Sequence, residues 1–196
     1  MTDRDLYAER ERLGIHVDVV EHPAVYTVEE SKRLRGELPG GHVKNLLLRN
    51  KKNELWLLCA LEDTAVDLKA LDAKIGSGRL SFANAEQLRS ALGIEAGAVS
   101  PLAVVNDTEN RVRVVLEERM LACERLNFHP LRNDATVGIA TADFLRFLEA
   151  RNHPPIRAQL DEQRQNERRQ PLSEAEHVQL GTVLADDQRS ETERRR

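Results

Sequence analysis

Lys44 and Asn45 are the residues of this chain whose types and position most suggest chemistry, because they stand where a glycine-rich loop enters an apolar strand. An ammonium at the edge of an apolar strand can lie at the rim of a pocket and pair with a phosphate or a carbonyl oxygen as a compact charge. A solvated lysine at the start of a strand is the alternative interpretation. Residue types and spacing alone leave both open.

Two further loops carry residues that could contact a ligand. His129 lies between an aromatic residue and a proline in the loop at 127–134, where a lone histidine is more often structural than catalytic. The loop at 97–101 precedes a predicted strand, and its glycine and proline would let backbone N–H groups approach a ligand closely, although taken alone it is a turn. Its residues are Gly97, Ala98, Val99, Ser100 and Pro101.

Several reaction classes lack their usual motifs. The glycine-rich segment at 36–41 has neither the GxGxxG spacing nor the GK[ST] ending of phosphate-binding loops. There is no HExxH motif and no HxE followed by CxxC, so we predict no metal and no cofactor. A GxSxG elbow is also missing, and Cys59 falls in an apolar run typical of the core. An enzyme built on this chain would therefore work by positioning and electrostatics.

Strand-like and helical patterns interleave along the chain. The runs at 43–49 and 54–61 are separated by four polar residues that suit a hairpin. In the helix predicted at 84–92, Asn84 and Gln87 have capping-box spacing and Gly93 is a stop signal. Further helices are predicted at 3–13, 27–34, 65–74 and 142–151, and further strands at 15–19, 102–105, 112–116, 123–128 and 136–139, with 102–105 and 112–116 as a second hairpin. The order indicates an α+β fold with a mixed, mostly antiparallel sheet or partial barrel surrounded by short helices.

The chain divides into a globular part and a charged extension. Its 196 residues are 40% hydrophobic and 32% charged, which fits one domain of ordinary core size. Two prolines after His153 end the last predicted helix, and the composition beyond is strongly polar. We predict a domain at 1–156 and a partly helical or disordered tail at 157–196. Contact of the tail with tRNA or a synthetase through its arginines is an alternative to a solvated tail.

Charge and hydropathy limit the partners. The formal net charge is −4 and the pI is near 5.9, so there is no global electrostatic reason to bind nucleic acid and no DNA partner is predicted. A local basic patch, which could equally be solvated, is formed by Lys44, Arg49, Lys51 and Lys52. No apolar run approaches membrane-spanning length and the N-terminus lacks an apolar leader, which predicts a cytoplasmic protein without a membrane partner.

Read together, four segments resemble the freestanding members of the YbaK and prolyl-tRNA synthetase-associated editing family. They span about residues 15–150, and the last two are most similar to the branch that deacylates alanyl-tRNA carrying the proline anticodon, often called ProX or PrdX. The segments are His22-Pro23 with Tyr26-Thr27, residues 41–46, the GxxxP loop at 97–101, and residues 128–136.

The resemblance implies a YbaK-like fold and a trans-editing hydrolase that deacylates mischarged tRNA(Pro), chiefly Ala-tRNA(Pro), by attack of water on the aminoacyl ester. By the same resemblance, Lys44 would anchor the phosphate of the terminal adenosine or orient the ester, with Asn45 beside it. The 97–101 loop would form the backbone wall around the aminoacyl group, His129 would shape the site or order water, and Tyr26 and Thr27 would contact the substrate. Prolyl-tRNA synthetase is the expected protein partner.

Editing is needed because a pocket made for proline cannot strongly exclude a smaller amino acid, whereas an editing pocket sized for a methyl group rejects the prolyl ring. Two alternatives stay open on the sequence. One is a deacylase for Cys-tRNA(Pro) or another aminoacyl-tRNA, and the other is a noncatalytic module that binds tRNA or the synthetase. The sequence does not show which tRNA bases are read or the oligomeric state.

Overall fold

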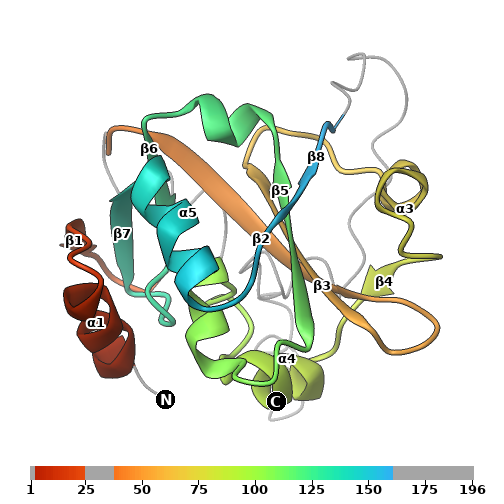
Figure 1. Cartoon of the computed structure of the whole chain (residues 1–196), viewed down its shortest axis with the longest axis horizontal. Helices are drawn as coiled ribbons and strands as arrows, with labels where there is room; N and C mark the ends of the chain where they lie inside the picture. Colours follow the sequence, from red (N-terminus) through yellow and green to blue (C-terminus); the bar gives the residue numbers. More distant parts are fainter. Residues whose placement is uncertain (1–2, 25–37, 161–196) are drawn as a thin grey trace, which may run out of the picture.

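The computed structural model describes residues 3–24 and 38–160. Eight strands in this part of the chain form one open sheet in the order β1-β7-β6-β2-β3-β5-β8, with β4 paired to β2 (Figure 1). The strands are β1 Val17–Glu21, β2 Gly41–Arg49, β3 Leu55–Leu61, β4 Ser81–Phe82, β5 Val112–Glu117, β6 Arg125–Phe128, β7 Ala135–Ala140 and β8 Ile156–Ala158. The helices are α1 Asp3–Arg12, α3 Leu68–Ile75, α4 Ala85–Leu92 and α5 Thr141–Ala150, with 3-10 helices η1 Pro101–Asn106 and η2 Arg119–Ala122.

The sheet is mixed, as predicted. The pairs β1–β7, β6–β7, β2–β3 and β2–β4 are antiparallel, whereas β2–β6, β3–β5 and β5–β8 are parallel. Strands β1 and β8 lie at opposite edges of the sheet, so it does not close into a barrel. This is the α+β class that the sequence indicates, with an open sheet rather than a partial barrel.

The β2–β3 hairpin forms the centre of the sheet and confirms the prediction made from its polar turn. The antiparallel register runs from Val43 opposite Leu61 to Arg49 opposite Leu55. Within the turn, the side-chain oxygen of Asn50 accepts the backbone N–H groups of Lys52 and Glu54, at 2.9 and 3.0 Å. An asparagine that binds its own turn in this way replaces the missing ladder partners and fixes the register.

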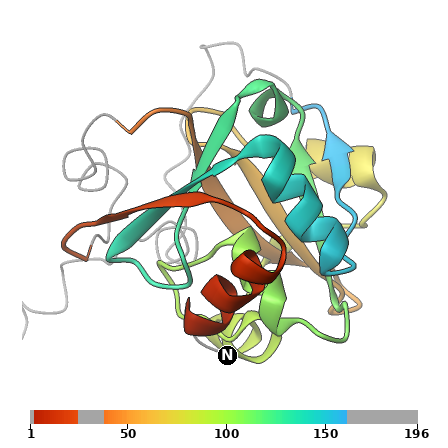
Figure 2. The same cartoon turned by 60° about the vertical axis from the view of Figure 1, so that its left-hand side comes forward.

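The sheet separates two apolar clusters, and helices flank it in Figure 2. On one face, Leu47 and Leu57 pack with residues of α4, η1 and α5. On the other face, Leu46 and Leu48 pack against Leu71 of α3. Neighbouring residues of β2 serve different layers because side chains alternate along a strand, and each fully buried leucine contributes about 2 kcal/mol.

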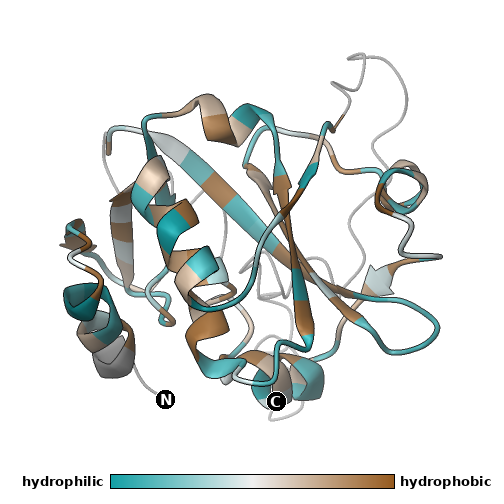
Figure 3. Ribbon diagram, in the orientation of Figure 1, coloured by the Kyte–Doolittle hydropathy of each residue, from teal (hydrophilic) through white to brown (hydrophobic). Residues whose placement is uncertain are grey.

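Helix signals in the sequence give the observed boundaries closely. Asn84 caps α4 in a capping box with Gln87, and Gly93 ends the helix at φ 64°. Helix α5 turns Phe144, Phe147 and other apolar side chains into the core, so teal and brown bands alternate along it in Figure 3. The helix predicted at 27–34 lies outside the described residues.

The prediction of a strand at 102–105 is wrong, and with it the predicted second hairpin. These residues lie in η1, where the side chain of Ser100 accepts the N–H of Leu102 at 3.2 Å and Pro101 occupies the first turn. Proline suits the start of a helix because its φ is already fixed and its missing N–H would have no partner there. A short run that is buried on all sides shows no periodicity that separates strand from helix, and residues 101–105 are all buried.

The end of the described chain contributes to the sheet. Strand β8 pairs in parallel with β5, and its Ala158 is buried. Residues 157 and 158, which the sequence analysis assigns to the tail, thus belong to the sheet, while residues 161–196 lie outside the described part. None of the helices described here has the length and apolar character needed to cross a membrane.

A buried contact between Asp107 and His153 ties the loop after η1 to the end of α5. Asp107 is 1% exposed, and its carboxylate accepts the N–H groups of Arg111 and Val112, at 3.1 and 2.7 Å. His153 faces the same carboxylate through Nε2 at 3.1 Å and donates through Nδ1 to the carbonyl of Arg151 at 2.7 Å. Both ring nitrogens of His153 are therefore within hydrogen-bond distance of an oxygen atom.

We expect Asp107→Ala to lower the free energy of unfolding by about 3 kcal/mol, because it leaves two N–H groups and a buried imidazole without their partner. The measurement is urea denaturation followed by circular dichroism. Glu109→Ala is the matched control, since its side chain is 75% exposed and a surface change of this kind costs less than about 0.5 kcal/mol. Equal losses in the two variants would contradict this account.

Candidate functional site

One side of strand β2 pairs with β3 along residues 43–49, whereas the other side is paired only near the two ends of the strand. Gly41 and His42 pair with β6, and Leu48 and Arg49 pair with β4. Residues 43–46 pair only with β3 among the described elements, and we call them the open edge of β2. The carbonyl of Leu47 accepts the N–H of Ala83 on this side at 2.9 Å, so by alternation the backbone groups of Val43 and Asn45 also point to the open edge.

Lys44 leaves the open edge on the face of the sheet that carries α3. Its ammonium donates to the carbonyl of Glu62 at 3.3 Å and to the carbonyl of Thr64, both in the turn that follows β3. A lysine ammonium has three donors, so these two bonds fix its direction and leave one N–H for a ligand. The alternative of a freely solvated lysine therefore does not describe this side chain.

The surroundings of Lys44 have two opposite effects on the pKa of its ammonium. Burial lowers the pKa of the Lys44 ammonium below its usual value of 10.5, and the carboxylates of Glu117, Asp63 and Glu62 oppose this shift. Glu117 has 0% exposure, so its carboxylate is buried. Lys44 is thus a half-buried cation held by carbonyl groups and facing an acidic group of residues.

Asn45 leaves β2 in the opposite direction from Lys44. It is 5% exposed, and its Nδ2 donates to the carbonyl of Val99 at 3.1 Å, which fixes the 97–101 loop against the strand. Its Oδ1 is buried and has no hydrogen-bond partner in the described chain. The pair Lys44 and Asn45 therefore approaches the open edge from two faces rather than side by side.

The 97–101 loop is a rigid wall. Residues 98–101 are buried, and Gly97 alone is partly exposed. Gly97 has φ 88°, a conformation that other residues rarely adopt, and Ala98 N–H donates to the carbonyl of Glu95 at 3.2 Å. Pro101 begins η1 directly afterwards, so the loop has little freedom to adapt to a ligand.

His129 belongs to a cluster at the end of β6. Its Nδ1 lies 3.0 Å from the carbonyl of Ala135 and must donate to it, because a carbonyl oxygen only accepts. The ring of His22 stands edge-on at 6.4 Å. His22 in turn donates from Nδ1 to the carbonyl of Pro23 at 2.9 Å, and its Nε2 lies 3.0 Å from the hydroxyl of Thr136.

The register relates this cluster to Lys44. His42 pairs with Asn127 across the parallel β2–β6 contact, and both Lys44 and His129 follow two residues later. His129 therefore leaves β6 at the level of Lys44, at the end of the neighbouring strand. The loop that carries it is held by Arg132, which bonds Glu21 of β1 and Asp134 at 2.5 Å each.

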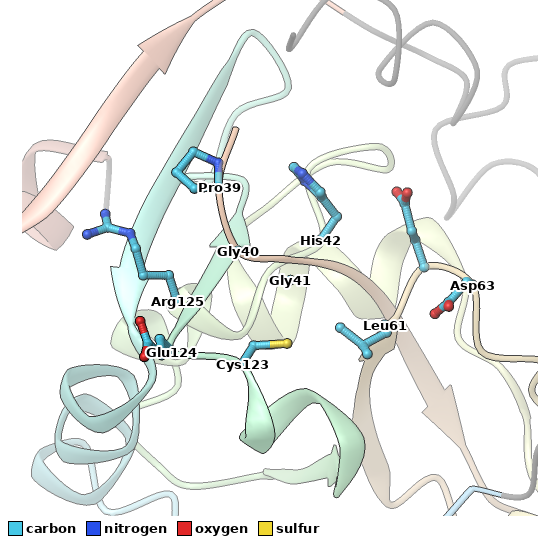
Figure 4. A pocket seen from close by; sticks show the side chains of 10 residues that line it. Pro39, Gly40, Gly41, His42, Leu61, Asp63, Cys123, Glu124 and Arg125 are labelled. Atoms are coloured by element: carbon cyan, nitrogen blue, oxygen red, sulfur yellow. The ribbon is translucent and has the colours of Figure 1, made fainter. Parts of the chain in front are cut away.

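A groove of about 570 Å³ lies at the beginning of β2. Figure 4 shows His42 and Asp63 on one side of it, Arg125 and Glu124 on the other, and the thiol of Cys123 directed toward Leu61. Glu62 lines the groove, and its carbonyl also accepts from the Lys44 ammonium. A side chain at Gly41 would meet Cys123 Sγ at 2.8 Å and Leu61 Cδ2 at 2.9 Å, so only glycine keeps this close packing.

The structure thus gathers three of the predicted segments around the open edge of β2: Lys44 with Asn45, the 97–101 loop, and the His129 loop. Tyr26 and Thr27 lie outside the described residues. Arg49, Lys51 and Lys52 of the predicted basic patch lie at the far end of the β2–β3 hairpin from Lys44. Among the described residues, no group of three or more His, Cys, Asp or Glu side chains could hold a metal ion.

Sequence reasoning missed Glu117 and Thr64, and it gave His22 no role beyond its place in one of the segments that resemble the editing family. Glu117 ends an apolar strand and is followed by a second glutamate, so its sequence suggests a solvated strand end. Thr64 lies in an ordinary turn, and His22 suggests a surface or packing role. Each acquires its place only through pairing with strands far away in the sequence, and no local signal could have revealed it.

The arrangement predicts that Lys44 titrates below pH 10.5. Burial disfavours the ammonium more strongly than the three carboxylates favour it. The measurement is the pH dependence of the lysine side-chain NMR signals, with the Lys44 signal assigned by its loss in Lys44→Arg. Titration of Lys44 at or above pH 10.5 would show that its ammonium is solvated or more strongly paired than the geometry implies.

Comparisons with known proteins agree with this architecture. The profile of the aminoacyl-tRNA editing domain matches residues 22–147. The chain is 38% identical over 147 residues to prolyl-tRNA synthetase associated domain-containing protein 1 of Danio rerio, covering 74% of this chain and 80% of that protein. It is also 38% identical over 144 residues to the prolyl-tRNA editing protein ProX of Acetoanaerobium sticklandii, covering 73% and 88%.

Solved structures give the same fold. One described as a candidate trans-editing enzyme for prolyl tRNA synthetase superposes with a TM-score of 0.65 at 23% sequence identity, covering 82% of this chain and 96% of that chain. The match of the domain profile over more than half of the sequence, together with the identity to these relatives, shows that the chain belongs to the aminoacyl-tRNA editing domain family.

Proposed function

We propose that the protein is a trans-editing hydrolase that deacylates mischarged tRNA(Pro), with Ala-tRNA(Pro) as its substrate. Family membership and the names of the ProX and prolyl-tRNA synthetase associated relatives support the class of reaction and the tRNA. The observation that carries the proposal is the Lys44 ammonium, which two backbone carbonyls hold at the open edge of β2. A fixed cation beside backbone N–H groups that point to the open edge suits an ester whose carbonyl oxygen becomes negative during hydrolysis.

In the proposed reaction, a water molecule attacks the ester carbonyl carbon that links the aminoacyl group to the terminal ribose. The new carbon–oxygen bond forms as the ester bond breaks, and the proton from water passes to the departing ribose oxygen. The products are free alanine and tRNA. The remaining N–H of Lys44 stabilises the carbonyl oxygen, and the substrate's own ribose hydroxyl assists the water.

A covalent path through a protein nucleophile has little support among the described residues near the open edge. Cys59 is fully buried, and burial raises the pKa of its thiol, so the reactive thiolate is disfavoured. Ser100 is 0% exposed, and its hydroxyl accepts the N–H of Leu102. Direct attack by water is therefore the path we propose, with His129 shaping the site or ordering that water.

Selectivity would arise from the rigidity of the wall formed by the 97–101 loop. Asn45 and the buried residues 98–101 leave the loop little room to yield. A cavity with fixed walls can admit the methyl group of alanine and exclude the larger prolyl ring, which gives the second sieve that the synthetase needs.

Lys44→Ala should lower the rate constant for deacylation of Ala-tRNA(Pro) by about 100-fold or more, because removal of one fixed donor to the developing oxyanion has an effect of this order. The assay is hydrolysis of labelled Ala-tRNA(Pro) by purified protein, with circular dichroism to verify folding. Lys69→Ala is the matched control, since Lys69 is an exposed lysine of α3. Unchanged turnover in the Lys44 variant would remove this role from Lys44.

A panel of tRNA(Pro) charged with alanine, cysteine, serine or proline tests the sieve. We expect rapid hydrolysis of Ala-tRNA(Pro) and little hydrolysis of Pro-tRNA(Pro), since a rigid pocket excludes the larger side chain. Fastest turnover of the cysteinyl ester would assign a Cys-tRNA(Pro) deacylase instead. Salt-sensitive binding without turnover of any ester would support a noncatalytic tRNA-binding module.

A further inference from the structure

Glu117 is a fully buried carboxylate in line with Lys44 across the sheet. Lys44 pairs with Ala60 of β3, and Cys59 pairs with Leu116 of β5, so the next residues, Ala60 and Glu117, continue side by side. Lys44, Ala60 and Glu117 therefore point to the same face on successive strands. Ala60, which lies between them, is small and fully buried.

Both oxygens of Glu117 hold that turn. Oε2 accepts the backbone N–H of Leu61 at 2.8 Å, and Oε1 accepts the hydroxyl of Thr64 at 2.7 Å. Hydrogen bonds to a charged acceptor are stronger than those between neutral groups. Glu117 thus fixes both ends of residues 61–64, which are the residues that present the carbonyls of Glu62 and Thr64 to Lys44.

Several charged or titratable residues surround Lys44, and Glu117 is the buried carboxylate among them. Glu62 and Asp63 belong to the turn, and His42 lies two residues before Lys44 on β2. Arg119, in η2, lies 3.7 Å from both Glu117 and Asp63 and donates to the hydroxyl of Thr64 at 3.3 Å. Asp63 is 68% exposed in its side chain and Glu117 is 0% exposed, so water screens the effect of Glu117 least.

We infer that Glu117 is a positioning residue for Lys44: through Thr64 and the N–H of Leu61 it sets the direction of the ammonium and supplies the buried countercharge for it. This role rests on the proposed function, since Lys44 is taken as the group that meets the ester. Glu117 does not itself touch substrate. The turn at 61–64 transmits the effect of Glu117 to Lys44, although the two residues are 73 positions apart in the sequence.

Glu117→Gln keeps the size of the side chain and removes its charge. We expect the pKa of Lys44, measured by side-chain NMR, to fall, because the raising effect of the carboxylate is lost. We expect kcat for Ala-tRNA(Pro) to fall about 10- to 100-fold with little change in KM, since displacement of a catalytic group by about 1 Å has effects of this size. Glu118→Gln is the control, because Glu118 is exposed and adjacent.

Thr64→Val tests the link if Glu117→Gln fails to fold, since it keeps the backbone carbonyl and removes only the hydroxyl that Glu117 holds. It should lower kcat, and Thr64→Ser, which retains the hydroxyl, should restore it. In a Lys44→Ala background, Thr64→Val or Glu117→Gln should have no further effect on the residual rate, whereas a general structural role would lower it again.

The outcomes separate this inference from the proposed function. A lowered Lys44 pKa in Glu117→Gln, in a protein that deacylates no ester, would support the coupling of the two residues and overturn the enzymatic role. Deacylation by the wild-type protein together with an unchanged Lys44 pKa and kcat in both Glu117→Gln and Thr64→Val would overturn the role of Glu117 and leave the enzyme standing.

Discussion

The part of the structure that concerns function depends on one constraint: a lysine ammonium placed inside a β-sheet must have polar partners. Lys44 lies on the same face of β2 as Leu46 and Leu48, whose side chains belong to an apolar cluster. Removal of an ammonium from water is costly unless it is paired and hydrogen-bonded. The turn after β3 meets this requirement with two carbonyls, and the buried Glu117 holds that turn.

The interruption of pairing along β2 leaves the edge beside this constrained cation open among the described elements. If β6 or β4 continued along residues 43–46, the backbone groups of Val43 and Asn45 would be used in the ladder. Instead, β6 pairs only with Gly41 and His42, and β4 only with Leu48 and Arg49. Lys44 from one face and the wall fixed by Asn45 from the other can therefore approach the same edge. The two adjacent residues have different tasks because a strand turns them apart.

Local chemistry predicted much of the fold. The β2–β3 hairpin and helix α4 follow from turn residues, capping pairs and a terminal glycine that act within a few residues. The strand predicted at 102–105 is wrong because a run buried on every side has no periodicity to identify it, and Ser100 with Pro101 starts a helical turn. The sequence places Lys44 where a glycine-rich loop enters a strand at 43–49, whereas β2 begins earlier, at Gly41, so Lys44 lies within the strand.

The partners of the site residues depend on distant strands and could not be predicted. Glu117 lies in line with Lys44 only because β3 stands between β2 and β5 and its register aligns the two residues. His22 meets the His129 loop because β1 pairs with β7, more than 100 residues later. The same separation explains why Asn45 seems to belong with Lys44 in the sequence but binds Val99 across the core.

The central claim is that a positioned lysine, rather than a protein nucleophile, supports hydrolysis of the mischarged ester. The most direct measurement is single-turnover hydrolysis of Ala-tRNA(Pro) with excess wild-type protein, followed by rapid quench and separation of protein from tRNA and alanine. The account predicts release of alanine far faster than in buffer, with no alanine attached to the protein at any time. Alanine that accumulates on the protein, or a rate equal to that in buffer, would contradict it.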